Sequence, residues 1–255
     1  MAVLLAIPFG IAIGVCLGLV GGGGSILAVP VLIYILDEPV KDATTASLLI
    51  VAASASFAAV SHRRRGCTDL RVAAGFAAAS AVGAVLGTVL NRGSDPDLIV
   101  IVLAVVMFTA AAAMLRRNGR DAETPRAPTG KAFWLRLIPA ALAVGVLTGY
   151  VGVGGGFLIL PVLTLLLGIR LDRAIGTSLV IIGVTSTVGL AAHLQGGSVN
   201  WAVALPFAAA AIIGSLIGAH YSARTSRQRL TRLFAGLVIA IALALVGATM
   251  AGLAS

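Results

Sequence analysis

The chain contains the same pattern twice. Residues 18–90 align without a gap on residues 149–221, so that each position matches the one 131 residues further along. Almost a third of the paired positions are identical, and many of the identities fall in two glycine-rich blocks, Gly21–Pro30 and Gly152–Pro161. Such a duplication predicts two halves that fold alike and contribute equivalent residues to whatever lies between them.

The composition is typical of a chain that lies within a lipid bilayer. Hydrophobic residues make up 59% of the chain and charged residues 11%, and the mean hydropathy is +1.08. Soluble domains are nearer half apolar and a quarter charged. A net charge of +9 would suggest nucleic acid as the partner of a soluble chain, but here the basic residues form short clusters between apolar runs. The sequence therefore predicts an all-α polytopic membrane protein and no nucleic-acid partner.

Several other classes find no support in the sequence. Cys16 lies inside an apolar run and Cys67 beside an arginine run, a spacing that builds neither a disulfide framework nor a metal site. The first residues lack the basic region of a secretory signal, so we expect the first helix to be kept. No Gly-x-x-x-x-Gly-Lys-Ser/Thr loop occurs, which argues against ATP hydrolysis by that route. We expect no cofactor, no metal and no enzymatic activity.

Ten apolar segments follow one another along the chain. A span needs about 20 residues, and most segments reach that length. The two that directly follow the glycine clusters have only about 12 residues, or roughly 18 Å as helix. This pattern predicts a first transmembrane repeat at 1–115, a linker at 116–131 and a second repeat at 132–255. The segments lie at 2–20, 25–36, 43–62, 70–90, 97–115, 134–151, 156–168, 173–193, 200–221 and 229–252.

The basic residues indicate how the short segments are arranged. If residues 2–36 form one broken crossing, the 18 Lys and Arg divide about 8 against 10 between the two sides. If they form a hairpin, about 16 lie on one side, and only Lys41 and Arg92 lie on the other. We therefore favour hairpins, whether fully crossing or re-entrant. Five elements per half then make the repeats inverted, place both termini outside and leave the linker 116–131 in the cytoplasm.

The glycine clusters suggest an anion site near the middle of the membrane. A short helix that starts there leaves backbone N–H groups without intrahelical partners. The helix dipole adds about half a positive charge, and glycine allows close approach of a ligand to the backbone. The alternative is that the small residues only permit tight helix packing, as we expect for Gly83, Gly87, Gly214 and Gly218. The predicted substrate-binding residues are Gly23, Gly24 and Ser25 in the first copy, and Gly154, Gly155 and Gly156 in the second.

A second repeated block supplies hydroxyl groups. Thr45 and Ser47 in the first copy, and Thr177 and Ser178 in the second, lie in the first turns of the helices that follow. Their hydroxyls could donate to the oxygens of an anion. The alternative is that they bond to carbonyls of their own helix or hold helices together.

Two histidines end equivalent segments in the two copies. His62 stands beside three arginines and His193 before a pair of glycines. Histidine could carry protons for coupled transport, or it could cap a helix and interact with its dipole. No Asp or Glu lies within an apolar core segment, which argues against a carboxylate proton relay.

Taken together, these motifs resemble those of the sulfite exporter family, TauE/SafE. The resemblance rests on the duplicated Gly-x-Gly-Gly-Gly-hydrophobic-Pro block, the Ala-x-x-Thr/Ala-Ser-Leu block and the histidine that ends the next segment, and it covers nearly the whole chain. It implies a transporter in the cytoplasmic membrane that moves small sulfur-containing anions, such as sulfite or organosulfonates. It also implies about eight spans, which agrees with the ten segments if the glycine-rich hairpins are re-entrant.

The sequence therefore predicts a secondary transporter that exports a small sulfur-containing anion by alternating access. An anion channel or a non-transporting membrane subunit is the main alternative, and the sequence leaves open whether the chain forms a homo-oligomer. An intramembrane enzyme with Ser25 as nucleophile is disfavoured, because Gly156 stands at the equivalent position and no Gly-x-Ser-x-Gly turn is present.

Overall fold

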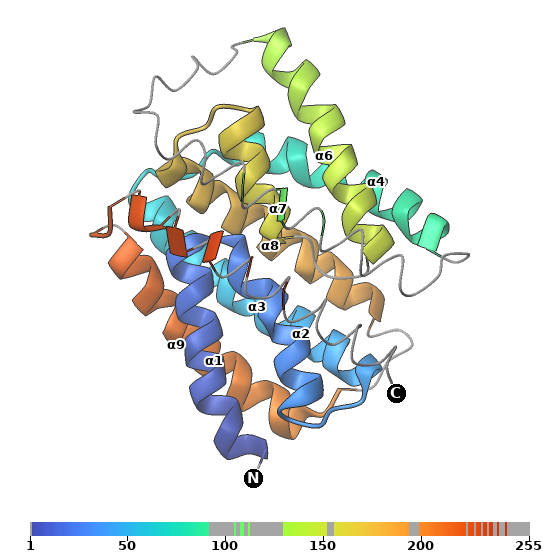
Figure 1. The fold of residues 1–255 in the computed structure, drawn as a ribbon, viewed down its shortest axis with the longest axis vertical. Coiled ribbons are helices and arrows are strands. Elements are labelled where there is room, and N and C mark those ends of the chain that lie inside the picture. The colour runs from blue at the N-terminus through green and yellow to red at the C-terminus, as the bar shows by residue number, and fades with distance from the viewer. Residues whose placement is uncertain are drawn as a thin grey trace.

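A computed structural model describes residues 2–91, 130–151, 156–193 and 199–222, with isolated positions at 105–112 and 224–243. Over these ranges the chain is helical, without strands (Figure 1). The predicted segments 97–115 and 229–252 lie largely outside the described residues, as do the predicted site residues Gly154 and Gly155. The helices are α1 (Ala2–Val20), α2 (Ser25–Tyr34), α3 (Val40–Arg64), α4 (Leu70–Asn91), α6 (Lys131–Val151), α7 (Gly156–Pro161), α8 (Leu171–His193) and α9 (Trp201–Ser222).

Five of the described helices, namely α3, α4, α6, α8 and α9, are long and apolar enough to cross a membrane. The apolar part of α1, Leu5–Val20, is shorter. Large apolar side chains also face outward from these helices, and Leu135 in α6 is 78% exposed. Such an apolar exterior is stable against lipid and not against water. The prediction of an all-α polytopic membrane protein is confirmed to this extent.

The second short segment differs from the first in its helix type. The first copy forms the ten-residue α-helix α2, whereas in the second copy α7 is followed by a π-helical turn at Val162–Leu166. The Thr164 hydroxyl donates to the carbonyl oxygens of Leu160 and Pro161, at 2.9 and 3.2 Å. Ile33 occupies the equivalent position in the first copy and has no hydroxyl. The extra side-chain bonds to helix carbonyls accompany the wider turn in the second copy alone.

The chain turns back on itself after α1 (Figure 1). Gly21 adopts a left-handed φ of 79°, which side chains disfavour, and Gly22–Gly24 form one short 3₁₀ turn before α2. A Cβ at Gly24 would lie 2.7 Å from both the Ile13 carbonyl oxygen and the Leu17 nitrogen. The start of α2 therefore packs against α1, and no side chain fits at position 24.

The outer helices pair between the halves, α1 with α9 and α4 with α6. Gly14 of α1 lies directly against the backbone of Ala211 in α9, and Gly145 of α6 lies directly against that of Ser80 in α4. These two contacts are equivalent, because 14 + 131 = 145 and 80 + 131 = 211. Each half thus packs one of its helices against the other half, in seams where small residues let the backbones touch. We call these two contacts the seams.

The middle of the molecule is formed by α3 and α8, which are equivalent helices. A Cβ at Gly183 would lie 2.9 Å from the Ser56 hydroxyl, and one at Gly189 would lie 3.4 Å from Leu48. Partner numbers fall along one helix as they rise along the other, so α3 and α8 run antiparallel. Their side chains belong to the buried core, with Ile50 in α3 and Leu179 in α8 fully covered.

Candidate functional site

The two glycine turns meet in the middle of the molecule. The backbone of Gly22 lies directly against the carbonyl group of Gly156, the first residue of α7. A Cβ at Gly156 would lie 2.6 Å from the Ser25 hydroxyl oxygen and 3.2 Å from the Gly22 carbonyl oxygen. The starts of α2 and α7, predicted to face each other, are therefore in contact.

Within the first turn, the glycines face different neighbours. Gly21 and Gly22 face α8 and α7, whereas Gly24 faces α1, and Gly23 belongs to the 3₁₀ turn between them. The sequence analysis chose Gly23 and Gly24 as site residues and did not include Gly21 or Gly22. Four consecutive glycines do not indicate which of them faces the second copy, so this distinction needed the fold.

Ser25 is the buried polar side chain at this contact. It is 6% exposed, and its hydroxyl donates to the Gly22 carbonyl oxygen at 2.7 Å. A serine hydroxyl rotates freely and also accepts through two lone pairs. Ser25 can thus close its own turn when no ligand is bound and donate to an oxyanion that approaches the turn.

Ser47 and Ser178 occupy equivalent, buried places. The Ser47 hydroxyl donates to the Thr44 carbonyl and the Ser178 hydroxyl to the Ile175 carbonyl, each at 2.8 Å. These are the bonds within a helix that the sequence analysis weighed as an alternative. Ser178 also faces the first turn, since its hydroxyl oxygen would lie 2.7 Å from a Cβ at Gly21. The structure therefore brings Ser178 of the second half to the glycine turn of the first.

Thr177 and Thr45 are also buried, but Thr177 contacts another part of the molecule. Its hydroxyl oxygen accepts the backbone N–H of Asp69, 3.0 Å away in the segment before α4. Next to it, the absence of a side chain at Gly176 lets the Cys67 carbonyl lie directly against α8. The start of α8 thus holds the α3–α4 loop of the first half.

His62 lies in the last turn of α3 and is 4% exposed. Its Nδ1 donates to the carbonyl oxygen of Ala58, 3.1 Å away and four residues earlier in the same helix. This contact fits the helix-end role weighed in the sequence analysis. His193 ends α8, and its side chain lies outside the described residues.

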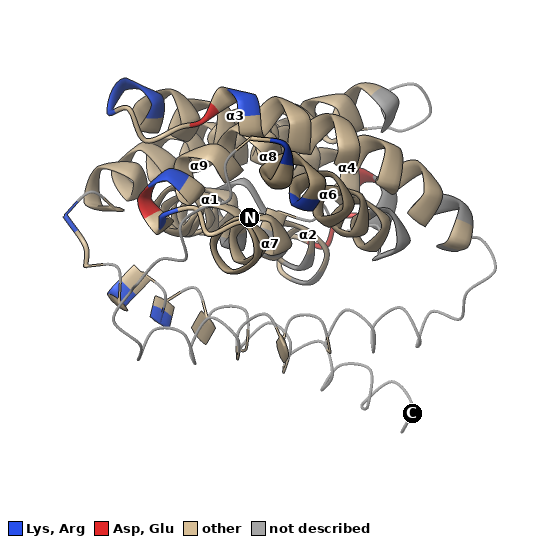
Figure 2. Ribbon diagram, turned by 90° about the horizontal axis from the view of Figure 1, so that it is seen from above, with Lys and Arg blue, Asp and Glu red and all other residues tan. Residues whose placement is uncertain are grey.

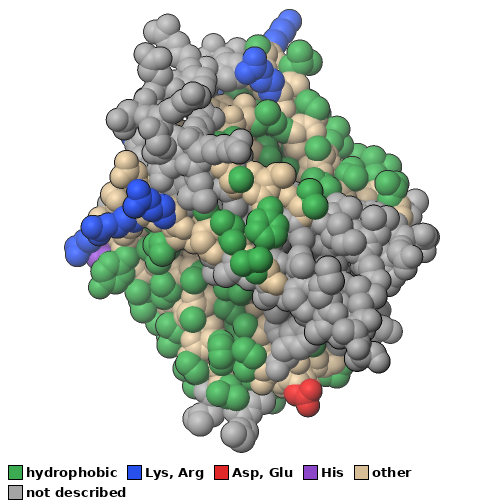
Figure 3. All heavy atoms as spheres, viewed as in Figure 1, with side chains coloured by type: hydrophobic (Ala, Val, Ile, Leu, Met, Phe, Trp, Pro, Cys, Tyr) green, Lys and Arg blue, Asp and Glu red, His purple; other side chains and the backbone are tan. Residues whose placement is uncertain are grey.

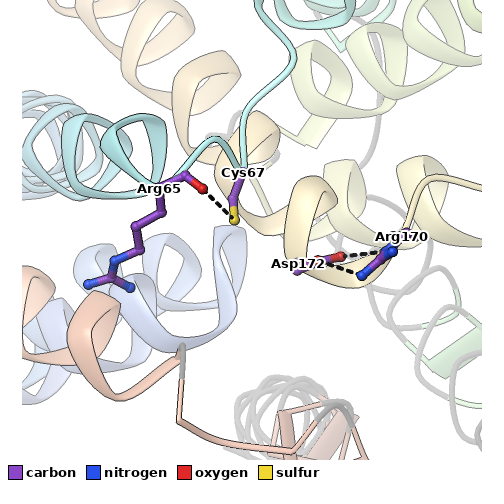
Figure 4. A network of polar contacts seen from close by, with 4 residues as sticks. All are labelled: Arg65, Cys67, Arg170 and Asp172. Carbon is purple, nitrogen blue, oxygen red and sulfur yellow. Dashed lines mark hydrogen bonds and ion pairs between the residues drawn. The ribbon is translucent and has the colours of Figure 1, made fainter.

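Two further contacts join the halves at opposite ends of the molecule. At the end where α3 finishes, Arg65 donates through Nη1 to the Ala219 carbonyl of α9 at 2.6 Å, and the Cys67 thiol contacts the Arg65 carbonyl oxygen (Figure 4). At the end where α3 begins, Asn200 donates through Nδ2 to Oε1 of the buried Glu38 at 2.8 Å. The sequence analysis missed both contacts.

Charge is distributed unequally between the two ends. Arg63, Arg64 and Arg65 close α3, and Arg170 forms an exposed ion pair with Asp172 at 3.1 Å near the start of α8 (Figure 4). In the views coloured by charge, basic side chains gather over the upper part of the molecule and acidic ones appear at its lower end (Figures 2 and 3). The described residues contain no group of three or more His, Cys, Asp or Glu that could hold a metal ion.

The sequence was compared with protein families, curated proteins and solved structures. Residues 6–245 match the family model described as "Sulfite exporter TauE/SafE". The chain is 31% identical to a "Probable membrane transporter protein" of Xylella fastidiosa (strain Temecula1 / ATCC 700964), over 99% of this chain and 98% of that one. It is 24% identical to the "Probable membrane transporter protein YdhB" of Bacillus subtilis (strain 168), over 82% of this chain and 86% of that one. No solved structure matches at a significant level. The chain therefore belongs to the sulfite exporter TauE/SafE family of membrane transporters.

Proposed function

We propose that this protein exports small sulfur-containing anions, such as sulfite, sulfoacetate or related organosulfonates, across the cytoplasmic membrane. The observation that carries the proposal is the meeting of the two glycine turns, where Gly21, Gly22 and Ser25 of one half face Gly156 and Ser178 of the other. The backbone N–H groups at a helix start, together with the hydroxyls, favour an anion. The family name agrees with a sulfur oxyanion.

The energy for export can come from the membrane potential. The described residues hold no nucleotide-binding loop of the Gly-x-x-x-x-Gly-Lys-Ser/Thr type, and none occurs elsewhere in the sequence. An interior-negative potential drives a monovalent anion outward with about 2.3 kcal/mol per 100 mV. Export down this gradient needs no second substrate.

Inverted repeats fit the directions of the helices. If each glycine block turns the chain back, and segment 97–115 crosses once, then α3 and α8 must run antiparallel across the membrane. A single broken crossing at each block would make them parallel. The contacts Gly183 with Ser56 and Gly189 with Leu48 are those of an antiparallel pair and support the hairpins. Both termini then lie outside, with the linker 116–131 in the cytoplasm.

Alternating access requires contacts between the halves that open in turn at the two ends. On the cytoplasmic side of the proposed topology these are Thr177 with Asp69 and Arg65 with Ala219; on the outer side the contact is Glu38 with Asn200. Both sets are formed in the same structure, as an occluded state needs. The direct contact of Gly22 with Gly156 leaves no open path between the turns, which favours a carrier over a channel.

Counterflow in proteoliposomes tests this function. Vesicles that contain the purified protein are loaded with unlabelled sulfite and diluted into labelled sulfite or sulfoacetate. A carrier gives saturable uptake that the internal anion accelerates. Flux that rises linearly with concentration and is not accelerated would favour a channel, and flux equal to that of empty vesicles would contradict transport of these anions.

A further inference from the structure

Positions 25 and 156 are counterparts in the two copies, since 25 + 131 = 156, and they touch each other. Ser25 stands in the first copy and Gly156 in the second. The Ser25 hydroxyl oxygen lies 2.6 Å from the point where a Gly156 Cβ would be. When two halves are related by a twofold axis, counterparts can touch only where that axis passes. The residue pair therefore marks the axis between the halves.

A side chain on such an axis collides with its own copy. A Cβ at position 156 would lie closer to Ser25 Oγ than real Cβ atoms approach, and it would also crowd the Gly22 carbonyl oxygen at 3.2 Å. The backbone offers no room for adjustment, because Gly22 already lies directly against the Gly156 carbonyl. Perfect symmetry with serine in both copies is thus excluded by packing.

We propose that positions 25 and 156 exclude each other's side chains, and that Ser25, as the side chain that occupies the axis, determines the specificity of the site. This proposal rests on the proposed function for its second part only. The departure of the second copy from the first at this position is then a requirement of the twofold arrangement. Symmetry would otherwise predict the same residue in both copies.

The exclusion makes the two sides of the site chemically unequal. The start of α2 carries the buried Ser25 hydroxyl, and the start of α7 carries no side chain at the equivalent position. Sulfite and sulfonates present three oxygens on one side of the sulfur, and a lone pair or a carbon on the other. Sulfate presents oxygens on every side. A site with a hydroxyl donor from one half suits the first kind of anion better, so Ser25 should favour sulfite and sulfonates over sulfate.

Three variants test both parts of the proposal. Gly156→Ser adds the colliding side chain, the double variant Ser25→Gly/Gly156→Ser exchanges the two residues, and Ser25→Ala removes only the hydroxyl. The melting temperature of each purified protein without ligand reports the packing. Titration with sulfite and with sulfate, followed by the same melting transition, reports binding and selectivity.

We expect Gly156→Ser to lower the melting temperature by about 5 °C, and the exchange to restore most of that loss. Ser25→Ala should melt close to the wild type but bind sulfite about tenfold more weakly, as expected for one lost hydrogen bond to an ion. Its affinity for sulfate should change less, so that the sulfite-to-sulfate ratio falls. A role for Ser25 in packing alone would leave this ratio unchanged.

Each part of the proposal can fail separately. If Gly156→Ser is as stable as the wild type, or if the exchanged protein is as unstable as Gly156→Ser, the side chains do not exclude each other. If Ser25→Ala binds both anions as the wild type does, Ser25 does not determine specificity. If no anion stabilises the wild type, the proposed function and the specificity role both fall, while the melting temperatures without ligand still decide the exclusion.

Discussion

Glycine serves two different ends in the seams and in the first turn. In the seams, Gly14 and Gly145 lie against helix backbone whose N–H and C=O groups are paired within their own helices. In the turn, Gly21 and Gly22 lie against the Ser178 hydroxyl and the backbone at the start of α7, where N–H groups have no intrahelical partner. Both regions are tightly packed, and only the turn offers donors to a ligand.

This difference separates two explanations that the sequence alone leaves entangled. Glycines that let helices approach each other stabilise the fold, and their replacement should cost stability first. Glycines at the helix starts also shape the proposed site, and their replacement should cost transport beyond any loss of stability. Gly24 belongs with the first kind despite its place in the cluster, because it packs against α1.

The largest effect is expected in the seams. Gly14→Val places a branched side chain into the Ala211 backbone, and over-packing of this kind costs about 3 kcal/mol or more. The melting temperature of the purified protein should fall by about 10 °C, with loss of monodisperse material. Gly236→Ala is the control, since nothing lies within 4 Å of a Cβ there. Equal yields and melting temperatures for both variants would contradict the seam.

The next effect separates the turn from simple backbone strain. Gly21→Ala and Gly66→Ala both force alanine into a left-handed conformation, at φ of 79° and 70°, and should lose about 1 kcal/mol each. Only at Gly21 does the new Cβ meet the Ser178 hydroxyl, at 2.7 Å, whereas the space at Gly66 is open. Sulfite transport should fall at least about tenfold for Gly21→Ala beyond any loss shared with Gly66→Ala. Equal transport in the two variants would mean that the turn is only a packing device.

A smaller effect concerns the contact of α8 with the α3–α4 loop, which belongs to neither the seams nor the turn. Thr177→Val removes the acceptor of the Asp69 N–H and leaves that group unpaired, at a cost of about 1–2 kcal/mol. The loop should open more often, and Cys67 should react with a maleimide up to about tenfold faster in a Cys16→Ser background. Unchanged labelling would show that this contact does not hold the cytoplasmic end closed.

The smallest effect is expected from the serines within α3 and α8. Ser178→Ala should weaken apparent sulfite affinity by about 1 kcal/mol, the value of one hydrogen bond, because Ser178 faces the Gly21 turn. Ser54→Ala is a matched control, since Ser54 is buried in α3 and donates to the Ile50 carbonyl. Affinities that change equally in both variants would return Ser178 to a packing role.

The sequence predicts the helices well, because apolar length and glycine punctuation are local signals. The segments at 2–20 and 70–90 match α1 and α4 to within about a residue. It does not predict the π-helical turn at Val162–Leu166, which accompanies the hydroxyl of Thr164.

The contacts between the halves could not be predicted in the same way. The offset of 131 residues says which residues are equivalent, but not that α1 packs against α9 of the other half. Glu38 and Asn200 are 162 positions apart, and nothing local in either segment indicates that they meet. The signal that was available is that Asp69 and Asn200 are counterparts, each just before a helix, and that each makes a hydrogen bond to the opposite half.

The most direct test of an anion site between the turns is the melting temperature of the wild-type protein with a panel of ligands. The panel comprises sulfite, sulfate, thiosulfate, sulfoacetate, simple carboxylates and cations, because a ligand that binds the folded state must raise its melting temperature. Selective stabilisation by a sulfur oxyanion or sulfonate is the result we predict. A flat response to every anion, with stabilisation by a cation or an uncharged solute, would contradict the site and leave the glycine turns as packing devices.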